Sequence, residues 1–203
     1  MWGDDMNKHV KNKLVIIASS TGGPKALHQV IPILDKNLDA PVVVVQHMPK
    51  GFTASLSQRL DELSEISVKE AKDGAILKKG HVYIARGGLH MRIVMNKQGV
   101  LQIEETEDAP VNGLRPCANV TFESILSCPF DFIVCAVLTG MGTDGCTGIE
   151  HLKEKHNIFT IAQNRETCVV YGMPKAVVEH ELADVVLPLE EIGKIINIKT
   201  GVR

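Results

Sequence analysis

The chain has 203 residues, of which 44% are hydrophobic and 23% are charged, and its formal net charge is −2. These values suffice for one domain with a buried core, and they exclude the basic excess that is typical of nucleic-acid-binding proteins. No apolar run approaches the roughly 20 residues of a membrane-spanning helix, and the first residues lack the layout of a signal peptide. We therefore expect a cytoplasmic protein that does not insert directly into a membrane.

The first third of the chain alternates short apolar runs with segments of helical spacing. Residues 1–12 are polar and unpatterned, and we interpret them as a tail or the remnant of a linker. Residues 14–18 and 41–46 are short, branched and almost entirely apolar, which predicts two buried strands. Each is followed by a predicted helix, the first over 22–34 and the second over 52–63.

The middle of the chain consists of short strand-like runs separated by glycine-containing turn signals. It predicts strands over 66–71 and 81–85 and a hairpin over 91–104 that turns at 96–99. Strands and helices then alternate again to the end of the chain. These later predicted elements are a helix over 116–127, a strand over 130–138, a helix over 148–155, a strand over 158–162, a helix over 174–181, a strand over 184–187 and a helix over 189–196.

Apolar strands that alternate with helices predict the α/β class, with a doubly wound and mostly parallel sheet. Helices are expected on both faces of this sheet, beside a small antiparallel hairpin. We expect one folded domain over 13–198, with short tails at 1–12 and 199–203.

Three side chains that could carry chemistry follow three of the predicted strands. Ser20 follows the strand over 14–18, His47 follows 41–46, and Asp144 lies in a glycine-rich loop after 130–138. Ligands of open α/β sheets bind outside the carboxyl ends of the strands. A hydroxyl, an imidazole and a carboxylate are therefore expected at one edge of the sheet, which predicts a catalytic triad.

The acidity of the three groups assigns their roles. A serine hydroxyl needs a base within hydrogen-bond reach, and His47 offers a side chain with a pKa near neutrality. Asp144 would orient the imidazole and stabilise the imidazolium. Taken alone, His47 and Asp144 have plainer interpretations, as a polar strand-end histidine and as a turn or helix-cap aspartate.

The turn around Ser20 has two interpretations. Small residues around a serine between a strand and a helix are typical of a nucleophile elbow, in which the amide of Thr21 would face an oxyanion. A glycine-rich turn at a helix start can also bind phosphate. The segment lacks the ending of a P-loop and the three-glycine dinucleotide spacing, so a phosphate- or nucleotide-binding module is the second choice.

Other reactive side chains offer weaker candidates. The five cysteines form no close pair and are expected to be reduced, and neither Cys146 nor Cys168 is marked as an activated nucleophile. The remaining candidate histidines lack clustered cysteine or acidic partners, so no metal site is expected. These histidines are His81, His90, His151 and His156.

The motifs together resemble the catalytic domain of the chemotaxis protein-glutamate methylesterases, the CheB family. The resemblance covers about residues 13–198 and depends on several spaced segments in the right order. These segments are ASSTGG at 18–23, QHMPKGFT at 46–53, GHVYIA at 80–85, PVN at 110–112, RP at 115–116, LTGMGTDG at 138–145, AQN at 162–164 and YGMP at 171–174.

The resemblance implies specific roles and a specific reaction. It selects Ser20 over Ser19 as the nucleophile, with His47 and Asp144 as its partners, and it places the backbone N–H of Met141 beside that of Thr21 in the oxyanion hole. It implies hydrolysis of glutamate γ-methyl esters on chemoreceptor signalling helices, without a metal or organic cofactor. Members of the family often deamidate receptor glutamines as well, and the resemblance leaves that activity open here.

The chain departs from the family pattern at two points. Ala18 stands where many members have glycine. Family members usually carry an N-terminal receiver domain, whereas about a dozen residues precede the first predicted strand here, so we expect that domain in the full-length protein. A receptor-binding domain without catalytic activity remains a third interpretation, and no nucleic-acid partner is expected.

Overall fold

The computed structural model of the chain describes residues 12–202, so most of the predicted tail at 1–12 lies outside the described residues. Its strands are β1 (Lys13–Ser19), β2 (Val42–Gln46), β3 (Ser67–Glu70), β4 (His81–Ile84), β5 (His90–Met95), β6 (Leu101–Thr106), β7 (Phe132–Val137), β8 (Ile158–Gln163) and β9 (Val185–Leu187). Its α-helices are α1 (Gly23–Val30), α2 (Phe52–Leu63), α3 (Ala118–Ser124), α4 (Cys146–Lys155), α5 (Met173–Glu179) and α6 (Leu189–Thr200), and two short 3₁₀ helices span Ile31–Ile33 and Arg165–Thr167.

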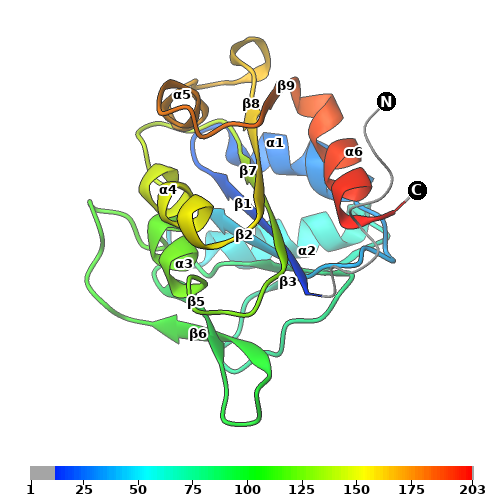
Figure 1. Cartoon of the computed structure of the whole chain (residues 1–203), viewed down its shortest axis with the longest axis vertical. Coiled ribbons are helices and arrows are strands. Elements are labelled where there is room, and N and C mark those ends of the chain that lie inside the picture. The colour runs from blue at the N-terminus through cyan, green and yellow to red at the C-terminus, as the bar shows by residue number, and fades with distance from the viewer. Residues whose placement is uncertain (1–11, 203) are drawn as a thin grey trace.

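A seven-stranded sheet forms the centre of the molecule, in the order β3-β4-β2-β1-β7-β8-β9 (Figure 1). Every pairing in it is parallel, and β5 and β6 form a separate antiparallel hairpin. The predicted α/β class, the doubly wound sheet and the hairpin are therefore confirmed.

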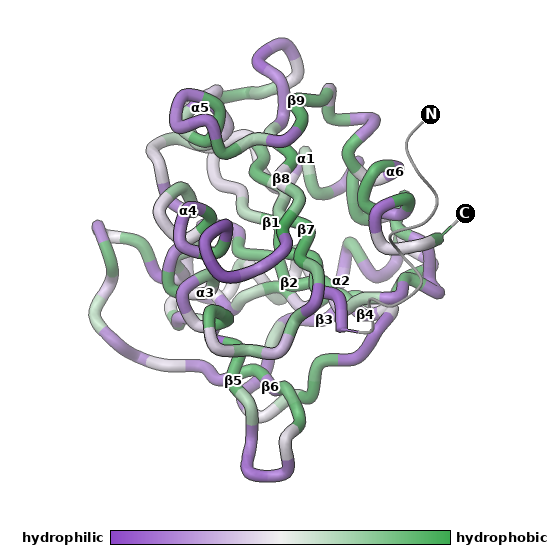
Figure 2. The backbone as a smooth tube through the Cα atoms, in the orientation of Figure 1, coloured by the Kyte–Doolittle hydropathy of each residue, from purple (hydrophilic) through white to green (hydrophobic). Residues whose placement is uncertain are grey.

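The residues of β1 alternate between two apolar layers. Leu14 and Ile16 face the layer that α3, α4, α5 and the hairpin cover, whereas Val15 and Ile17 face the layer under α1, α2 and α6. All four side chains are fully buried. A strand covered on both faces must be apolar on both sides, which explains the continuous hydrophobic run that predicted it. Figure 2 shows this apolar centre beneath more polar helices.

Two predicted helices are shorter than expected by several residues. The first ends at Val30 and continues as a 3₁₀ turn that contains Pro32, because proline cannot donate the next helical hydrogen bond. The helix expected over 116–127 covers only Ala118–Ser124, since Cys117 before it is extended. The last helix is longer than expected and reaches Thr200.

The sheet order places a crossing point beside β1. The chain moves from β1 to β2 on one side and later returns to β7 on the other, so β2, β1 and β7 are neighbours. Connections that leave adjacent parallel strands in opposite directions open a crevice at their carboxyl ends, and ligands of such sheets bind there. No helix within the described residues 12–202 is both long and apolar enough to cross a membrane.

Candidate active site

The three residues predicted for the site follow the three neighbouring strands. Ser20 comes directly after β1, His47 directly after β2, and Asp144 at the end of the loop that follows β7. Backbone hydrogen bonds join these segments: His47 N donates to Ser19 O at 3.0 Å, and Ser20 N donates to Thr139 O at 3.0 Å. The predicted convergence at one sheet edge is therefore present in the fold.

His47 and Asp144 are in direct contact. His47 Nε2 lies 2.7 Å from Asp144 Oδ2, and the two side chains are only 9% and 6% exposed. An ionised carboxylate can only accept hydrogen bonds, so Nε2 carries the hydrogen of the neutral ring. This tautomer leaves the lone pair of Nδ1 free to act as a base.

The carboxylate of Asp144 is held by three further donors from the start of α3. Its Oδ2 accepts from Ala118 N at 2.6 Å, and its Oδ1 accepts from Asn119 N and Cys117 Sγ, both at 3.0 Å. Burial works against ionisation here, but the hydrogen bonds from His47 and from these donors outweigh it and lower the pKa of Asp144 below 3.8. The ionised form that pairs with histidine is thus built into the site.

The lowered pKa of Asp144 predicts a pH-dependent contribution to stability. Because the folded state binds this proton more weakly than the unfolded state, the contribution is complete above the ordinary pKa of 3.8 and is lost as pH falls through the lowered folded value. We expect Asp144→Asn to destabilise the protein more at pH 7 than at pH 3, measured by urea unfolding at both values. An equal loss of unfolding free energy at both pH values would contradict this expectation.

The cysteines near the site are poor nucleophiles. Burial, followed by the negative charge of Asp144, raises the pKa of Cys117 to about 12, and burial raises that of Cys168 to about 11. Burial also raises the pKa of Cys146. A thiol that stays protonated at neutral pH does not attack an ester, so Cys117 acts here as a hydrogen-bond donor.

The two adjacent serines differ in their surroundings. Ser19 is fully buried, and its hydroxyl donates to Gln46 Oε1 at 2.7 Å. Ser20 is half-buried at the sheet edge. Gln46 also donates from Nε2 to the carbonyl oxygens of Ser20 and His47, both at 3.0 Å, so one buried amide ties the two segments together.

The predicted oxyanion donors belong to two turns that touch at Ser20. Thr21 is exposed, and Met141, which follows Gly140, is 71% exposed. A Cβ at Gly140 would lie 2.8 Å from Ser20 Cβ, so only glycine permits this close approach. Both predicted amides therefore lie in segments that flank Ser20 at the open edge of the sheet.

The other candidate residues have structural partners of their own. His81 faces the carbonyl of Lys79, His90 that of Ala109, His156 those of Phe130 and Leu126, and His151 the carboxylate of Glu123. The five cysteines form no disulfide. Within residues 12–202, no group of three or more histidine, cysteine or acidic side chains could hold a metal ion.

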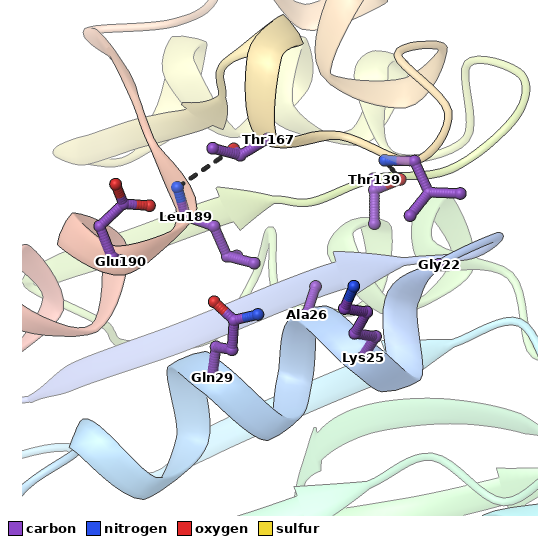
Figure 3. Close-up of a pocket in the computed structure, with 9 residues that line it drawn as sticks. Gly22, Lys25, Ala26, Gln29, Thr139, Thr167, Leu189 and Glu190 are labelled. Atoms are coloured by element: carbon purple, nitrogen blue, oxygen red, sulfur yellow. Dashed lines mark hydrogen bonds between the residues drawn. The ribbon is translucent and has the colours of Figure 1, made fainter.

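A cavity of about 170 Å³ lies behind the turn that carries Ser20 (Figure 3). Its walls come from α1, the segments after β7 and β8 and the start of α6, and Ser20, His47 and Asp144 do not line it. The lining residues are Gly22, Lys25, Ala26, Gln29, Thr139, Thr167, Val169, Leu189 and Glu190. The cavity thus borders the predicted site without containing it.

Three residues that shape the site received no role from the sequence. Gln46 joins the Ser20 and His47 segments, whereas Cys117 and Asn119 hold Asp144. A polar residue that ends an apolar strand is a usable signal for Gln46. Cys117 and Asn119 offer no such signal, because their contact with Asp144 depends on how α3 and α4 pack.

The comparisons with known proteins identify the family of this chain. The family model described as CheB methylesterase matches residues 15–196. The protein-glutamate methylesterase/protein-glutamine glutaminase 1 of Syntrophomonas wolfei is 50% identical over 184 residues, which cover 89% of this chain and 52% of that protein. The protein-glutamate methylesterase/protein-glutamine glutaminase of Bacillus subtilis is 46% identical over 181 residues, which cover 89% of this chain and 50% of that protein.

A solved structure shows the same fold. The crystal structure of the Thermotoga maritima CheB methylesterase catalytic domain matches with a TM-score of 0.87 and 44% identity, over 92% of this chain and 98% of that one. The chain spans about half the length of the curated relatives it matches. The family model, the identities and the shared fold give one conclusion: this chain belongs to the CheB methylesterase family.

Proposed function

We propose that the chain is a serine hydrolase that removes methyl groups from glutamate γ-methyl esters on chemoreceptor signalling helices. The observation that carries the proposal is the buried contact between His47 and Asp144 at 2.7 Å, beside Ser20 on the next strand. The names of the relatives, protein-glutamate methylesterase/protein-glutamine glutaminase, support the choice of substrate.

In the proposed mechanism, Ser20 Oγ attacks the ester carbonyl while Nδ1 of His47 takes its proton. The negative charge that develops on the carbonyl oxygen is met by the amides of Thr21 and Met141, and the imidazolium is balanced by Asp144. Collapse expels methoxide, which takes the proton from His47 and leaves as methanol. Water, deprotonated by His47, then attacks the acyl-serine and releases the glutamate carboxylate and the free Ser20 hydroxyl.

The same residues can hydrolyse a glutamine side chain. The leaving group would then be ammonia, protonated by His47, and the acyl-serine intermediate would be identical. The second half of the relatives' names, protein-glutamine glutaminase, favours this additional activity. We propose deamidation of receptor glutamines as a second reaction of the same site.

The proposed partners are inferred from the proposed substrate and from the fact that the relatives are about twice as long as the matched region. We propose methylated receptor helices in the cytoplasm as substrate, and a regulatory receiver domain within the part of the full-length protein that this chain does not cover. A phosphate-binding module and a receptor-binding domain without activity remain the competing functions. Release of methanol from methylated receptor membranes, and its loss in Ser20→Ala, would support the esterase and exclude both competitors.

The adjacent serines give the proposal a matched control. Ser19→Ala removes a buried hydroxyl that donates to Gln46 Oε1 but leaves the bonds from Gln46 Nε2 to Ser20 and His47 in place. We therefore expect this variant to retain most of the methanol release. Ser20→Ala should lose nearly all of it. A serine-directed phosphonate should label the peptide that carries Ser20, identified by mass spectrometry. Labelling of Ser19, or an inactive but folded Ser19→Ala variant, would overturn the assignment.

A further inference from the structure

The side chain of Asn119 joins the two segments on either side of Asp144. Its Oδ1 accepts hydrogen bonds from Gly145 N at 3.0 Å and from Gly148 N at 2.9 Å, in the first turn of α4. Its own backbone N–H donates to Asp144 Oδ1 at 3.0 Å. Asn119, a residue of α3, therefore binds both the carboxylate of Asp144 and the start of α4, the helix that follows Asp144.

The hydrogen bonds between α3 and α4 are reciprocal. Neither helix is capped by the side chain of its own N-cap residue, which is Cys117 for α3 and Gly145 for α4. Asp144, directly before α4, accepts from the first amides of α3, and Asn119 accepts from those of α4. Each helix thus receives its capping acceptor from the segment that begins the other.

Close packing holds the two helices at the distance that this exchange requires. A Cβ at Gly148 would lie 2.5 Å from Phe122 Cβ, so α4 approaches α3 more closely than any larger residue would permit. Phe122 is fully buried. The position of Asp144 is therefore fixed by the contact between α3 and α4, not by the loop after β7 alone.

We propose that Asn119 is a positioning residue for the Asp144–His47 pair. By holding Gly145 and Gly148 it fixes the backbone on which Asp144 stands, and Asp144 in turn orients the imidazole toward Ser20. This inference rests on the proposed esterase activity, in which the orientation of His47 limits the transfer of the serine proton. Asn119 itself touches no reacting atom.

The variant Asn119→Ala separates this role from direct contact with Asp144. It keeps the backbone N–H that binds the carboxylate and removes only the acceptor of the two glycine amides. We expect kcat for methanol release to fall by about ten- to a hundredfold with little change in KM, because misplacement of a catalytic group slows chemistry more than it weakens substrate binding. Asn119→Asp restores an acceptor oxygen at the same place and should recover most of kcat, measured at the same pH as the wild type.

A second measurement does not depend on activity. In the wild type the proton between His47 Nε2 and Asp144 should give a downfield proton NMR resonance, and Asn119→Ala should weaken or shift it. Asn197→Ala is the matched control, since it also removes side-chain hydrogen bonds between two elements, to the backbone of Ile33 and Asp35. It should lower stability without changing kcat or the resonance.

The outcomes distinguish the two proposals. A folded Asn119→Ala variant with wild-type kcat and an unchanged resonance would overturn the positioning role. So would equal losses in Asn119→Ala and Asn197→Ala, or a failure of Asn119→Asp to recover activity. If the wild type releases no methanol, the proposed function fails, and the resonance alone then decides whether Asn119 positions the pair.

Discussion

Ser20→Ala and His47→Ala should each lower kcat for methanol release by about 10⁴-fold or more, while the fold stays intact. In the proposed mechanism, the first removes the atom that forms the acyl intermediate, and the second removes the base that activates it. Ser20 is half-buried at the sheet edge, and Ser20→Ala keeps the Cβ that lies beside Gly140, so truncation should cost little stability. Circular dichroism and urea unfolding would confirm that the variants are folded.

The double variant gives the sharper result. If Ser20 and His47 act as a unit, then removing the second residue should add almost nothing to the loss caused by the first. Rates for the wild type, both single variants and the double variant would be measured on the same receptor membranes. Two losses that multiply would show that His47 does not serve Ser20, and the proposed mechanism would have to be abandoned.

Asp144→Asn should lower kcat by about 10⁴-fold, through the orientation and tautomer of His47. The carboxylate accepts four hydrogen bonds, two at each oxygen. Asparagine has one oxygen that accepts hydrogen bonds and one NH₂ group that donates them. The NH₂ group must therefore point at hydrogen-bond donors that the second carboxylate oxygen accepts from in the wild type. Either His47 loses its acceptor, or the amide repels the donors from Cys117 and Asn119.

The control for this variant is Asp108→Asn, which changes a carboxylate that pairs with Arg92 and Thr106 in an exposed segment. That variant also removes one negative charge, at a position distant in sequence from the Asp144 loop. It should keep kcat within a fewfold of the wild-type value. A folded Asp144→Asn enzyme with normal turnover would mean that His47 needs no carboxylate partner.

The sequence predicted the elements whose patterns are local. The runs around Val15 and Val43 are apolar on both sides of the strand, and α2 was predicted with the bounds that the structure gives it. The convergence of Ser20, His47 and Asp144 was predictable because parallel strands share one carboxyl edge. The strand order that makes β1 the neighbour of both β2 and β7 carries no local signal.

The support of the site could not be predicted for the same reason. Asn119 and Asp144 are 25 residues apart, and their hydrogen bond exists only because Gly148 lets α4 lie against Phe122. A sequence pattern reports what one segment prefers, not which pair of helices will pack. Gln46 could be predicted in part. A polar residue at the end of an apolar strand stands out in the sequence, but the sequence does not show which three groups it binds.

The central place of β1 has a consequence for how this protein is made. Its neighbour β7 lies more than a hundred residues later in the chain, and His47 and Asp144 are 97 residues apart. A ribosome therefore releases β1, β2 and Ser20 well before the carboxylate that completes the site has been synthesised. Pairings of such long range also form late in folding. Under the proposed mechanism, a nascent chain cannot cleave esters until its second half has been translated and β7 has paired with β1.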